Sequence, residues 1–534
     1  MHVFHPLLRA PGGLCAAALG AALWLAPAAP AAPAAQLGSR PQAAEQRPQP
    51  VCVRDVQLGL GEGAERVTLL LGEGRILGRQ AADAPPPPGH ILVDGTGLIA
   101  LPAFVDAFTT RGVTTPSPTP DRDEVQDPRA DVWVDMRPAL RRGLSPAFRA
   151  VDTATLSTEH LDAWRGAGFG YALQSPSGEL LSGRAVMVSL REGALRERVV
   201  RSDVAMHASF SSTGGGYPGT LMGRIAHLRQ FALDAAHFAE LRRRQEADLP
   251  GPRPPYDPDL EVAAQLASGE LPLLCAAERP ADLSRWLRLA EEFGWRPVAL
   301  GGRELGADAE RLANRGLAAV LTLAWGDEVD DPRKEKKKDA PGGRSKDKSE
   351  PEDAADGVEP DGVDPDGVDP DGGDPEGVGD EPAPEPEATP EAADTEPAAP
   401  KAYEEPFALR LERRLKWEER RGTAIALALR GVPFAFGTAD EAPGDLLGKV
   451  RELVEAGLPQ EAALEALTDG AWRTLGAGAS GSLDDGSAAS LALWSANPLS
   501  DKKARVEWMI VEGHLWRAPA KKESGAGNKD EEKR

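Results

Sequence analysis

One short stretch, residues 90–112, constrains the fold of this chain more than any other. An apolar run from Ile91 to Val93 is followed by a polar corner at residues 94–97. A second apolar run, Leu98–Val105, ends on the polar cluster of residues 106–110. A buried strand that delivers polar side chains at its C-terminal end is how a parallel barrel builds an active site. The stretch therefore predicts a barrel strand with functional residues after Val105.

The charge of the chain is concentrated in one region. The 534 residues include 61 basic and 84 acidic side chains, for a net charge of −23. Residues 351–400 alone hold 18 acidic residues and no Lys or Arg, so the remainder is only mildly acidic. A nucleic-acid role is disfavoured because the sequence contains no basic stripe and no interleaving of basic and aromatic residues.

The N-terminus has the pattern of a secretory signal. Arg9 precedes the apolar segment Leu14–Ala28, and Ala-Pro repeats then provide small-residue cleavage sites up to Ala35. The alternative is a membrane anchor, but the apolar run is short and broken by proline. We therefore predict a signal peptide at 1–35 and a linker at 36–49. The mature chain is expected to be exported to the periplasm or the exterior, with no membrane span after cleavage.

Beyond Leu98, strand-like runs alternate with segments of helical periodicity, as in a (β/α) barrel. The helical spacing is clearest at residues 283–293 and 446–454. This alternation predicts an α/β fold with a TIM-like (β/α)8 barrel. Not all eight strands can be located, which leaves a distorted barrel open. The candidate strands after the first are Ala147–Val151, Gly168–Leu173, Leu271–Ala277, Arg296–Gly301, Ala318–Ala324 and Pro433–Thr438.

Residues 327–403 interrupt this alternation. A run of mixed charge at 333–338 leads into Asp-Gly-Val-Asp/Glu-Pro repeats and then Glu-, Pro- and Ala-rich sequence. A segment with so few apolar residues cannot bury a core, so we predict a disordered acidic insertion between two parts of the barrel. Residues 518–534 are predicted to be a charged tail.

Two motifs carry a resemblance to a known family, and the first consists of Asp94, Gly97, Pro102, Phe104, Val105, Asp106 and Gly112. Together with a second motif at 457–464 and 481–491, it resembles the amidohydrolase superfamily, in particular imidazolonepropionase-like and dihydroorotase-like enzymes. The second, at Gly457–Leu464 and Gly481–Leu491, is similar to that family's return from the barrel to a β-domain. The resemblance implies a barrel at 101–326 and 404–481. It also implies a small composite β-sandwich domain at 50–100 and 482–517.

The resemblance also indicates where metal ligands would lie. Amidohydrolases attack C–N bonds with a metal-bound hydroxide, held by histidines and an aspartate at the barrel mouth. Phe, Ala and Gly cannot bind a metal, and a Thr hydroxyl is a poor neutral donor. We therefore predict a degenerate site without a metal cofactor. The residues at the ligand positions are Phe108, Thr110, Ala276, Gly301 and Ala439.

Polar residues near the same positions provide a second interpretation. Asp106 and Asp440 are candidates for a carboxylate pair in metal-free acid/base catalysis. Glu278, Arg279 and Glu304 are candidates for the pocket. The alternative for all of them is a structural role as hydrogen-bonded parts of the scaffold.

These patterns favour an exported amidohydrolase-like protein that lacks the metal centre and hydrolytic activity. It would act as a binding or scaffold protein for a small molecule, alone or as a homo- or hetero-oligomer with an amidohydrolase paralogue. The first alternative is a hydrolase of non-peptide C–N bonds in cyclic amides, working with a metal-free site or with zinc or another divalent metal on unconventional ligands. The second is a structural protein of the cell envelope that uses the acidic insertion for contacts.

Overall fold

The computed structural model accounts for most of the chain outside its two ends and the acidic insertion. The predicted signal peptide lies outside the described residues, as do most of the linker, the insertion and the tail. No helix within the described part of the chain is long and apolar enough to cross a membrane. The described residues are 48–61, 63–115, 142–211, 218–279, 281–302, 305–334, 405–478 and 481–519.

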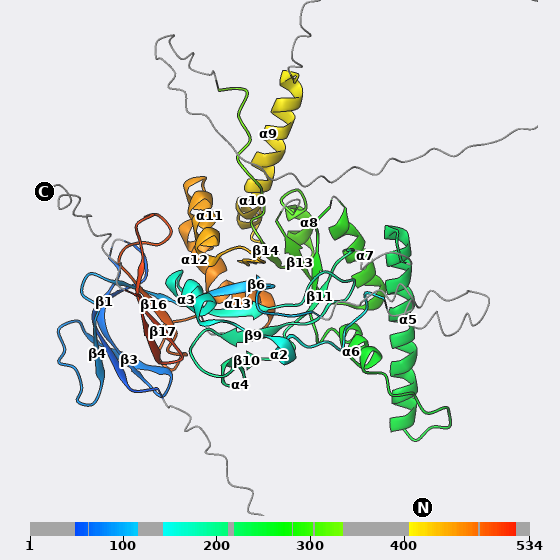
Figure 1. Cartoon of the computed structure of the whole chain (residues 1–534), viewed down its shortest axis with the longest axis horizontal. Helices are drawn as coiled ribbons and strands as arrows, with labels where there is room; N and C mark the ends of the chain where they lie inside the picture. Colours follow the sequence, from blue (N-terminus) through cyan, green and yellow to red (C-terminus); the bar gives the residue numbers. More distant parts are fainter. Residues whose placement is uncertain are drawn as a thin grey trace, which may run out of the picture. The chain divides into compact units, whose positions relative to one another are not determined.

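Strands from both ends of the described chain form one eight-stranded sheet, in the order β18-β17-β16-β5-β1-β2-β3, with β4 pairing β1 (Figure 1). The peptide N–H of Ile76 in β3 also donates to Ser487 O at 2.9 Å, just before β16. The eight strands are hydrogen-bonded into one sheet, and their buried side chains form one apolar cluster. The strands are β1 (Val51–Leu58), β2 (Arg66–Gly72), β3 (Arg75–Ala81), β4 (Ile91–Asp94), β5 (Ile99–Pro102), β16 (Leu491–Trp494), β17 (Val506–Val511) and β18 (His514–Arg517).

Two further sheets carry the barrel strands. The first has the order β10-β9-β7-β6, and the second has the order β15-β14-β13-β12-β11-β8. The pairs β6–β7 and β11 to β15 are parallel, whereas β9 and β8 run antiparallel to their neighbours β7 and β11. The strands are β6 (Phe104–Thr109), β7 (Phe169–Gln174), β8 (Gly183–Arg184), β9 (Val186–Ser189), β10 (Val199–Arg201), β11 (Met206–Ala208), β12 (Leu273–Ala276), β13 (Pro297–Gly301), β14 (Ala319–Leu321) and β15 (Phe434–Phe436).

Hydrogen bonds join these two sheets at both edges. The peptide N–H of Thr110 donates to Ala439 O at 2.8 Å, which connects β6 to the residues after β15. At the other edge, Ala185 N donates to Ala205 O at 2.8 Å, next to β11. The inward side chains of these strands form one apolar cluster. The result is a TIM-barrel-like α/β fold whose interior is packed rather than open.

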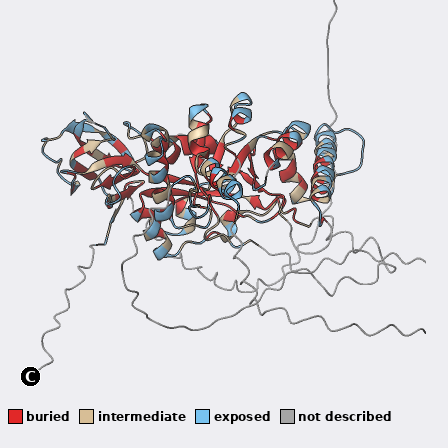
Figure 2. Cartoon of the chain, turned by 90° about the horizontal axis from the view of Figure 1, so that it is seen from above, coloured by how far each residue is buried: buried red, intermediate tan, exposed pale blue. Residues whose placement is uncertain are grey.

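Helices connect and cover the barrel strands, with buried faces turned inward and exposed faces outward (Figure 2). In α7, Leu283, Trp286, Leu287 and Ala290 recur at helical spacing and are all buried. The helices are α2 (Ala150–Thr153), α3 (Thr158–Gly166), α4 (Leu195–Arg198), α5 (Leu221–Glu246), α6 (Pro258–Ala267), α7 (Asp282–Phe293), α8 (Ala309–Asn314), α9 (Phe407–Arg421), α10 (Thr423–Leu429), α11 (Pro443–Glu455), α12 (Gln460–Leu467) and α13 (Asp469–Leu475).

One predicted barrel strand is wrong. Residues 147–151 form only an isolated bridge, between Arg149 and Arg184, and the helix α2 begins at Ala150. A short apolar run has no periodicity that separates a strand from a buried helical turn, so the sequence was ambiguous at this point. The antiparallel strand β9 and the short β11 supply neighbours that the sequence analysis did not locate.

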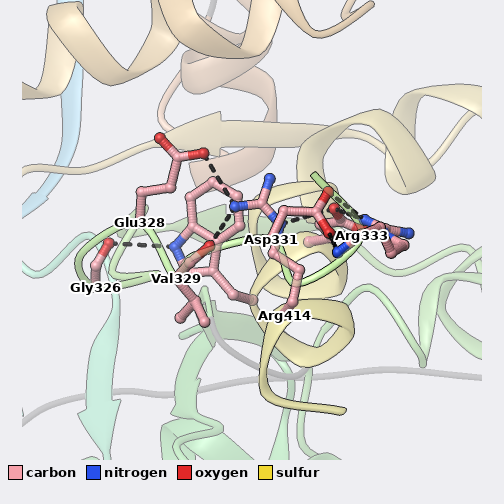
Figure 3. Close-up of polar contacts among 8 residues, drawn as sticks. Gly326, Glu328, Val329, Asp331, Arg333 and Arg414 are labelled. Carbon is pink, nitrogen blue, oxygen red and sulfur yellow. Dashed lines mark hydrogen bonds and ion pairs between the residues drawn. The ribbon is translucent and has the colours of Figure 1, made fainter. Parts of the chain in front are cut away.

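The flanks of the acidic insertion are tied to each other (Figure 3). Arg414 of α9 is only 6% exposed, and its guanidinium donates to Glu328 Oε1 at 3.0 Å and to Val329 O at 2.5 Å. It also lies 4.4 Å from the ring centroid of Trp417. Arg333 pairs with Glu418 of α9 at 2.6 Å. The first residues of the predicted insertion, 327–334, are therefore part of the packed structure.

Replacing residues 335–404 with a Gly/Ser linker is expected to leave the fold intact. Arg333 contacts Glu418, and Glu405 lies about 20 Å away along α9, a gap that about 12 linker residues span. The melting temperature should change by no more than about 2 °C, because loop length affects stability only weakly. Arg414→Ala in the same shortened chain is the comparison and should lower the melting temperature clearly. Unfolding of the shortened chain itself would contradict this account.

Candidate functional site

Apolar side chains occupy the predicted ligand positions at the end of β6 and β12. Phe108 and Ala276 belong to the same apolar cluster as Leu274 and Leu300, which point into the barrel. Phe108 is 4% exposed, and its ring stacks on that of His207 with centroids 5.7 Å apart. An aromatic ring thus fills space inside the barrel next to the strand ends.

The backbone at Gly301, at the end of β13, leaves no room for a side chain. Gly301 has a φ of +146°, a conformation that L residues rarely adopt. A Cβ built on it would lie 2.9 Å from the carbonyl oxygen of Ala277, closer than such contacts normally allow. A histidine at this position would require the backbone of β13 or the residues after β12 to move.

The backbone carbonyl of Ala439, after β15, accepts hydrogen bonds from the residues at the end of β6, a contact that we call the backbone clamp. Ala439 has a φ of +53°, so its carbonyl turns towards the residues that follow β6. That carbonyl accepts from the peptide N–H of Thr110 at 2.8 Å and from the hydroxyl of Thr109 at 2.9 Å. The hydroxyl of Thr110 adds a bond to the same oxygen at 3.3 Å. Thr110 therefore contributes to closing the barrel rather than offering a free ligand.

A small cavity lies at the C-terminal ends of β12, β13 and β14. Its volume is about 250 Å³, and two of the predicted positions, Glu278 and Gly301, come together in its wall. Arg279 is exposed nearby, and its peptide N–H donates to Asp282 at 3.0 Å. Glu304 lies outside the described residues. The cavity lining consists of Ala277, Glu278, Gly301, Gly302, Thr322 and Ala324.

Asp106 is fully buried and connects three parts of the barrel. Its Oδ2 accepts from Trp164 Nε1 of α3 at 2.9 Å and from the Thr438 hydroxyl at 2.6 Å. Its Oδ1 accepts from Thr438 N at 2.9 Å and from Phe108 N at 3.3 Å. Burial raises the pKa of Asp106 to about 6, although these hydrogen bonds act in the opposite direction. Both carboxylate oxygens are therefore engaged in holding the scaffold.

Asp440 stands in a different setting. Its backbone carbonyl accepts from the guanidinium of Arg111. Within the part of the chain that the structure describes, no hydrogen bond joins its carboxylate to Asp106. The acid/base pair expected from the sequence would need a proton-transfer path between these two carboxylates. The hydrogen bonds described for them do not supply one.

A buried Ser–His contact lies close to Phe108 and was not identified from the sequence. The hydroxyl of Ser182 is 2.9 Å from Nδ1 of His207, and both residues are buried. Burial lowers the pKa of His207 to about 4, so the ring is neutral near pH 7. The Ser182 hydroxyl is also 3.2 Å from Glu179 O. Neither side chain lines the cavity at the strand ends, and the pair is best explained as packing of the interior.

The titrations of His207 and Asp106 are expected to oppose each other. The pKa of His207 falls from 6.5 to about 4, so the stability it contributes is present above pH 6.5 and lost as the pH falls through 4. The pKa of Asp106 rises from 3.8 to about 6, so its contribution is present below pH 3.8 and lost as the pH rises through 6. Each shift corresponds to about 3 kcal/mol.

Unfolding of the His207→Asn variant in urea between pH 7 and pH 4 tests this opposition. The variant has no imidazole at position 207 to be protonated on unfolding. On acidification its free energy of unfolding should therefore fall by about 3 kcal/mol less than that of the wild type. His237→Asn, on the exposed side of α5, is the control and should follow the wild type. Parallel curves for the His207 variant and the wild type would show that the buried ring does not titrate as described.

The donor set at the strand ends does not fit zinc. Among the described residues, no group of three or more His, Cys, Asp or Glu side chains is placed to hold a metal ion. The hydroxyl of Thr110 is already bonded to Ala439, and Glu278 is the one carboxylate that the described residues place in the cavity wall. A single carboxylate does not make the closed or three-ligand set that zinc takes in proteins.

Comparison with solved structures identifies the fold. An amidohydrolase from Thermotoga maritima MSB8 is similar with a TM-score of 0.59, over 88% of this chain and 100% of that one. This chain has the amidohydrolase fold. The sequence identity is 17%, so this likeness concerns the fold alone. A prolidase complexed with N-methylphosphonate-L-proline covers 88% of this chain at 13% identity, with a TM-score of 0.46.

Sequence comparisons add little to the structural one. No protein-family model matches the chain. A 93-residue match at 37% identity is found to the lysylphosphatidylglycerol biosynthesis bifunctional protein LysX of Nocardia farcinica. It covers 17% of this chain and 8% of that protein, so this chain spans less than a tenth of its relative's length.

Proposed function

We propose that this amidohydrolase-fold protein has no metal centre and binds a small molecule at the barrel mouth without hydrolysing it. The observation that carries the proposal is the backbone of Gly301, which excludes a side chain where the family resemblance places a histidine. The buried ring of Phe108 and the backbone clamp at Ala439 support it at two other ligand positions.

The chemistry of amide hydrolysis explains why these replacements matter. Water is a poor nucleophile near neutral pH, and bound zinc makes it reactive by lowering its pKa to about 7. That effect needs several basic ligands converging on one point. A phenyl ring, a methyl group and a hydrogen atom supply no electron pair for a metal. The carboxylate of Asp106, two residues before Phe108, already accepts hydrogen bonds from Trp164 and Thr438.

Binding is the role that the remaining features support. The cavity of about 250 Å³ is suited to a fragment-sized molecule. Its lining is mostly small and apolar, with the Thr322 hydroxyl and the Glu278 carboxylate as polar groups. A carboxylate at the rim of such a cavity favours a ligand that carries a hydrogen-bond donor or a positive charge. We further propose export by the N-terminal segment and assembly with a second copy or with an amidohydrolase paralogue.

The proposal is tested by measuring binding and turnover on the same preparation. A panel of cyclic amides and imides is screened by thermal shift, and each is assayed for hydrolysis with and without added zinc, manganese or iron. We expect at least one saturable shift that Glu278→Gln removes, and no hydrolysis above the buffer rate. Glu270→Gln, an exposed carboxylate away from the cavity, is the control and should bind like the wild type. Metal-dependent turnover would establish the hydrolase alternative instead.

A further inference from the structure

A buried arginine with two donors that are unpaired within the described chain lies far from the cavity at the strand ends. Arg198, the last residue of α4, is 5% exposed, and its Nε and Nη1 find no hydrogen-bond partner among the described residues. Arg165 of α3 is 1% exposed, and its Nη2 is likewise unpartnered within the described chain. Leaving a buried charged donor without an acceptor is costly, so such groups call for an explanation.

Contacts with the loop of residues 190–197 bring these arginines together with Arg191. Nε of Arg165 donates to Leu190 O at 2.7 Å, at the start of the loop. Arg191 donates to Glu192 O at 3.3 Å and to Glu197 O, at the end of the loop. Arg198 follows directly. Arg165 and Arg191 are thus bonded to the backbone of this segment, and Arg198 is the residue that ends it.

This region lies at the opposite end of the barrel from the candidate site. The peptide N–H of Leu190 donates to Gly170 O at 2.8 Å, close to the beginning of β7. The cavity lined by Glu278 and Gly301 lies instead at the ends of β12 and β13. In a parallel barrel, strand beginnings and strand ends form opposite faces. The arginine cluster is therefore separate from the site proposed for the small molecule.

The acidic residues nearby neutralise two of the arginines and leave the third unpaired. Asp162 and Glu192 each approach Arg165 to 3.4 Å. Glu512, from the turn after β17, pairs with Arg191 at 3.0 Å. Burial lowers the pKa of Arg198, and the positive charges of Arg165 and Arg191 lower it further. An anion is the group that would remove this repulsion.

We propose that Arg165, Arg191 and Arg198 form a binding site for a tetrahedral oxyanion, a phosphate or sulfate group. The planar guanidinium fork matches two oxygens of such a group and forms short, charge-assisted bonds with it. Nε and Nη1 of Arg198, with Nη2 of Arg165, supply free donors for this purpose. Glu192 and Gly193, in the loop next to these donors, are exposed to solvent.

Titration of the full mature chain with inorganic phosphate tests the site. Calorimetry and thermal shift are run at constant ionic strength, with chloride as the reference anion. The wild type should bind phosphate saturably, and Arg198→Gln should weaken the affinity by about tenfold or more, since a charged hydrogen-bonded pair is lost. Arg196→Gln is the matched control in the same helix, because Arg196 is 80% exposed and pairs only loosely with Glu197 at 3.6 Å. It should bind phosphate like the wild type.

The outcomes separate the proposal from its rivals. Absence of saturable phosphate binding by the wild type overturns it, whatever the variants do. Equal weakening by Arg196→Gln and Arg198→Gln also overturns it, because that would indicate a diffuse surface effect. Parallel titrations with sulfate and with a phosphate monoester distinguish a site for the free ion from one for a phosphorylated small molecule. Tighter binding of the monoester, still lost in Arg198→Gln, would assign the site to the latter.

Discussion

Asp106→Ala is expected to lower the free energy of unfolding by about 3–5 kcal/mol at pH 5, below the raised pKa of the carboxyl, measured by urea unfolding. The hydrogen bonds described for Trp164 Nε1 and for the Thr438 hydroxyl both end on the Asp106 carboxylate, which the substitution removes. It also leaves the peptide N–H groups of Phe108 and Thr438 without that acceptor. Buried donors without acceptors are among the largest sources of destabilisation in point variants.

Asp440→Ala is the matched control, because the bond described for Asp440 uses its backbone carbonyl and survives the substitution. Its free energy of unfolding should stay within about 0.5 kcal/mol of the wild type. The pair of variants also separates the two roles proposed for these carboxylates. If both variants kept wild-type stability and both abolished hydrolysis of a cyclic amide, Asp106 and Asp440 would be catalytic and the scaffold role would be wrong.

Gly301→Ala is expected to destabilise the chain by about 2–4 kcal/mol, from a disfavoured φ and a steric clash together. The added Cβ would lie 2.9 Å from the carbonyl oxygen of Ala277, at a φ of +146°. Gly301→His, which would restore the residue type implied by the resemblance, should be destabilised at least as much. Thermal and urea unfolding monitored by circular dichroism measure both effects.

Gly448→Ala provides the reference for a glycine without such constraints. Gly448 lies inside α11, and nothing comes within 4 Å of a Cβ built on it. Alanine is the better helix former by about 1 kcal/mol, so this variant should be slightly more stable than the wild type. A Gly301→Ala variant as stable as Gly448→Ala would mean that β13 tolerates a side chain, and the steric argument against a histidine there would fail.

Continuous apolar runs made most of the parallel strands predictable. β7 and β12 to β15 overlap the strands expected at 168–173, 271–277, 296–301, 318–324 and 433–438, and every bound agrees within three residues. Strands buried on both faces read as unbroken apolar segments, which is a strong local pattern. The segment from Gly183 to Ser189 was harder, because it pairs antiparallel with β7 on one side and β11 on the other. No local pattern specifies that pairing.

The residues of the candidate site were expected from the resemblance, and their contacts come from the structure. The resemblance placed Phe108, Ala276 and Ala439 at the barrel mouth, and the structure packs all three into or against one apolar cluster. The bonds of Asp106 to Trp164 and Thr438 were not predictable, because they join residues 58 and 332 positions apart. Such contacts depend on how the strands close into a barrel, which a single sequence does not encode locally.

Metal content of the folded protein tests the central claim most directly. The mature chain is expressed with added zinc, manganese and iron, purified without chelators, and analysed by plasma mass spectrometry beside a circular dichroism spectrum. We predict a folded protein with far less than one metal ion per chain, because Phe108, Gly301 and Ala439 offer no side-chain ligands. A stoichiometric metal that survives dialysis and is retained by the folded chain would contradict this account and favour the hydrolase.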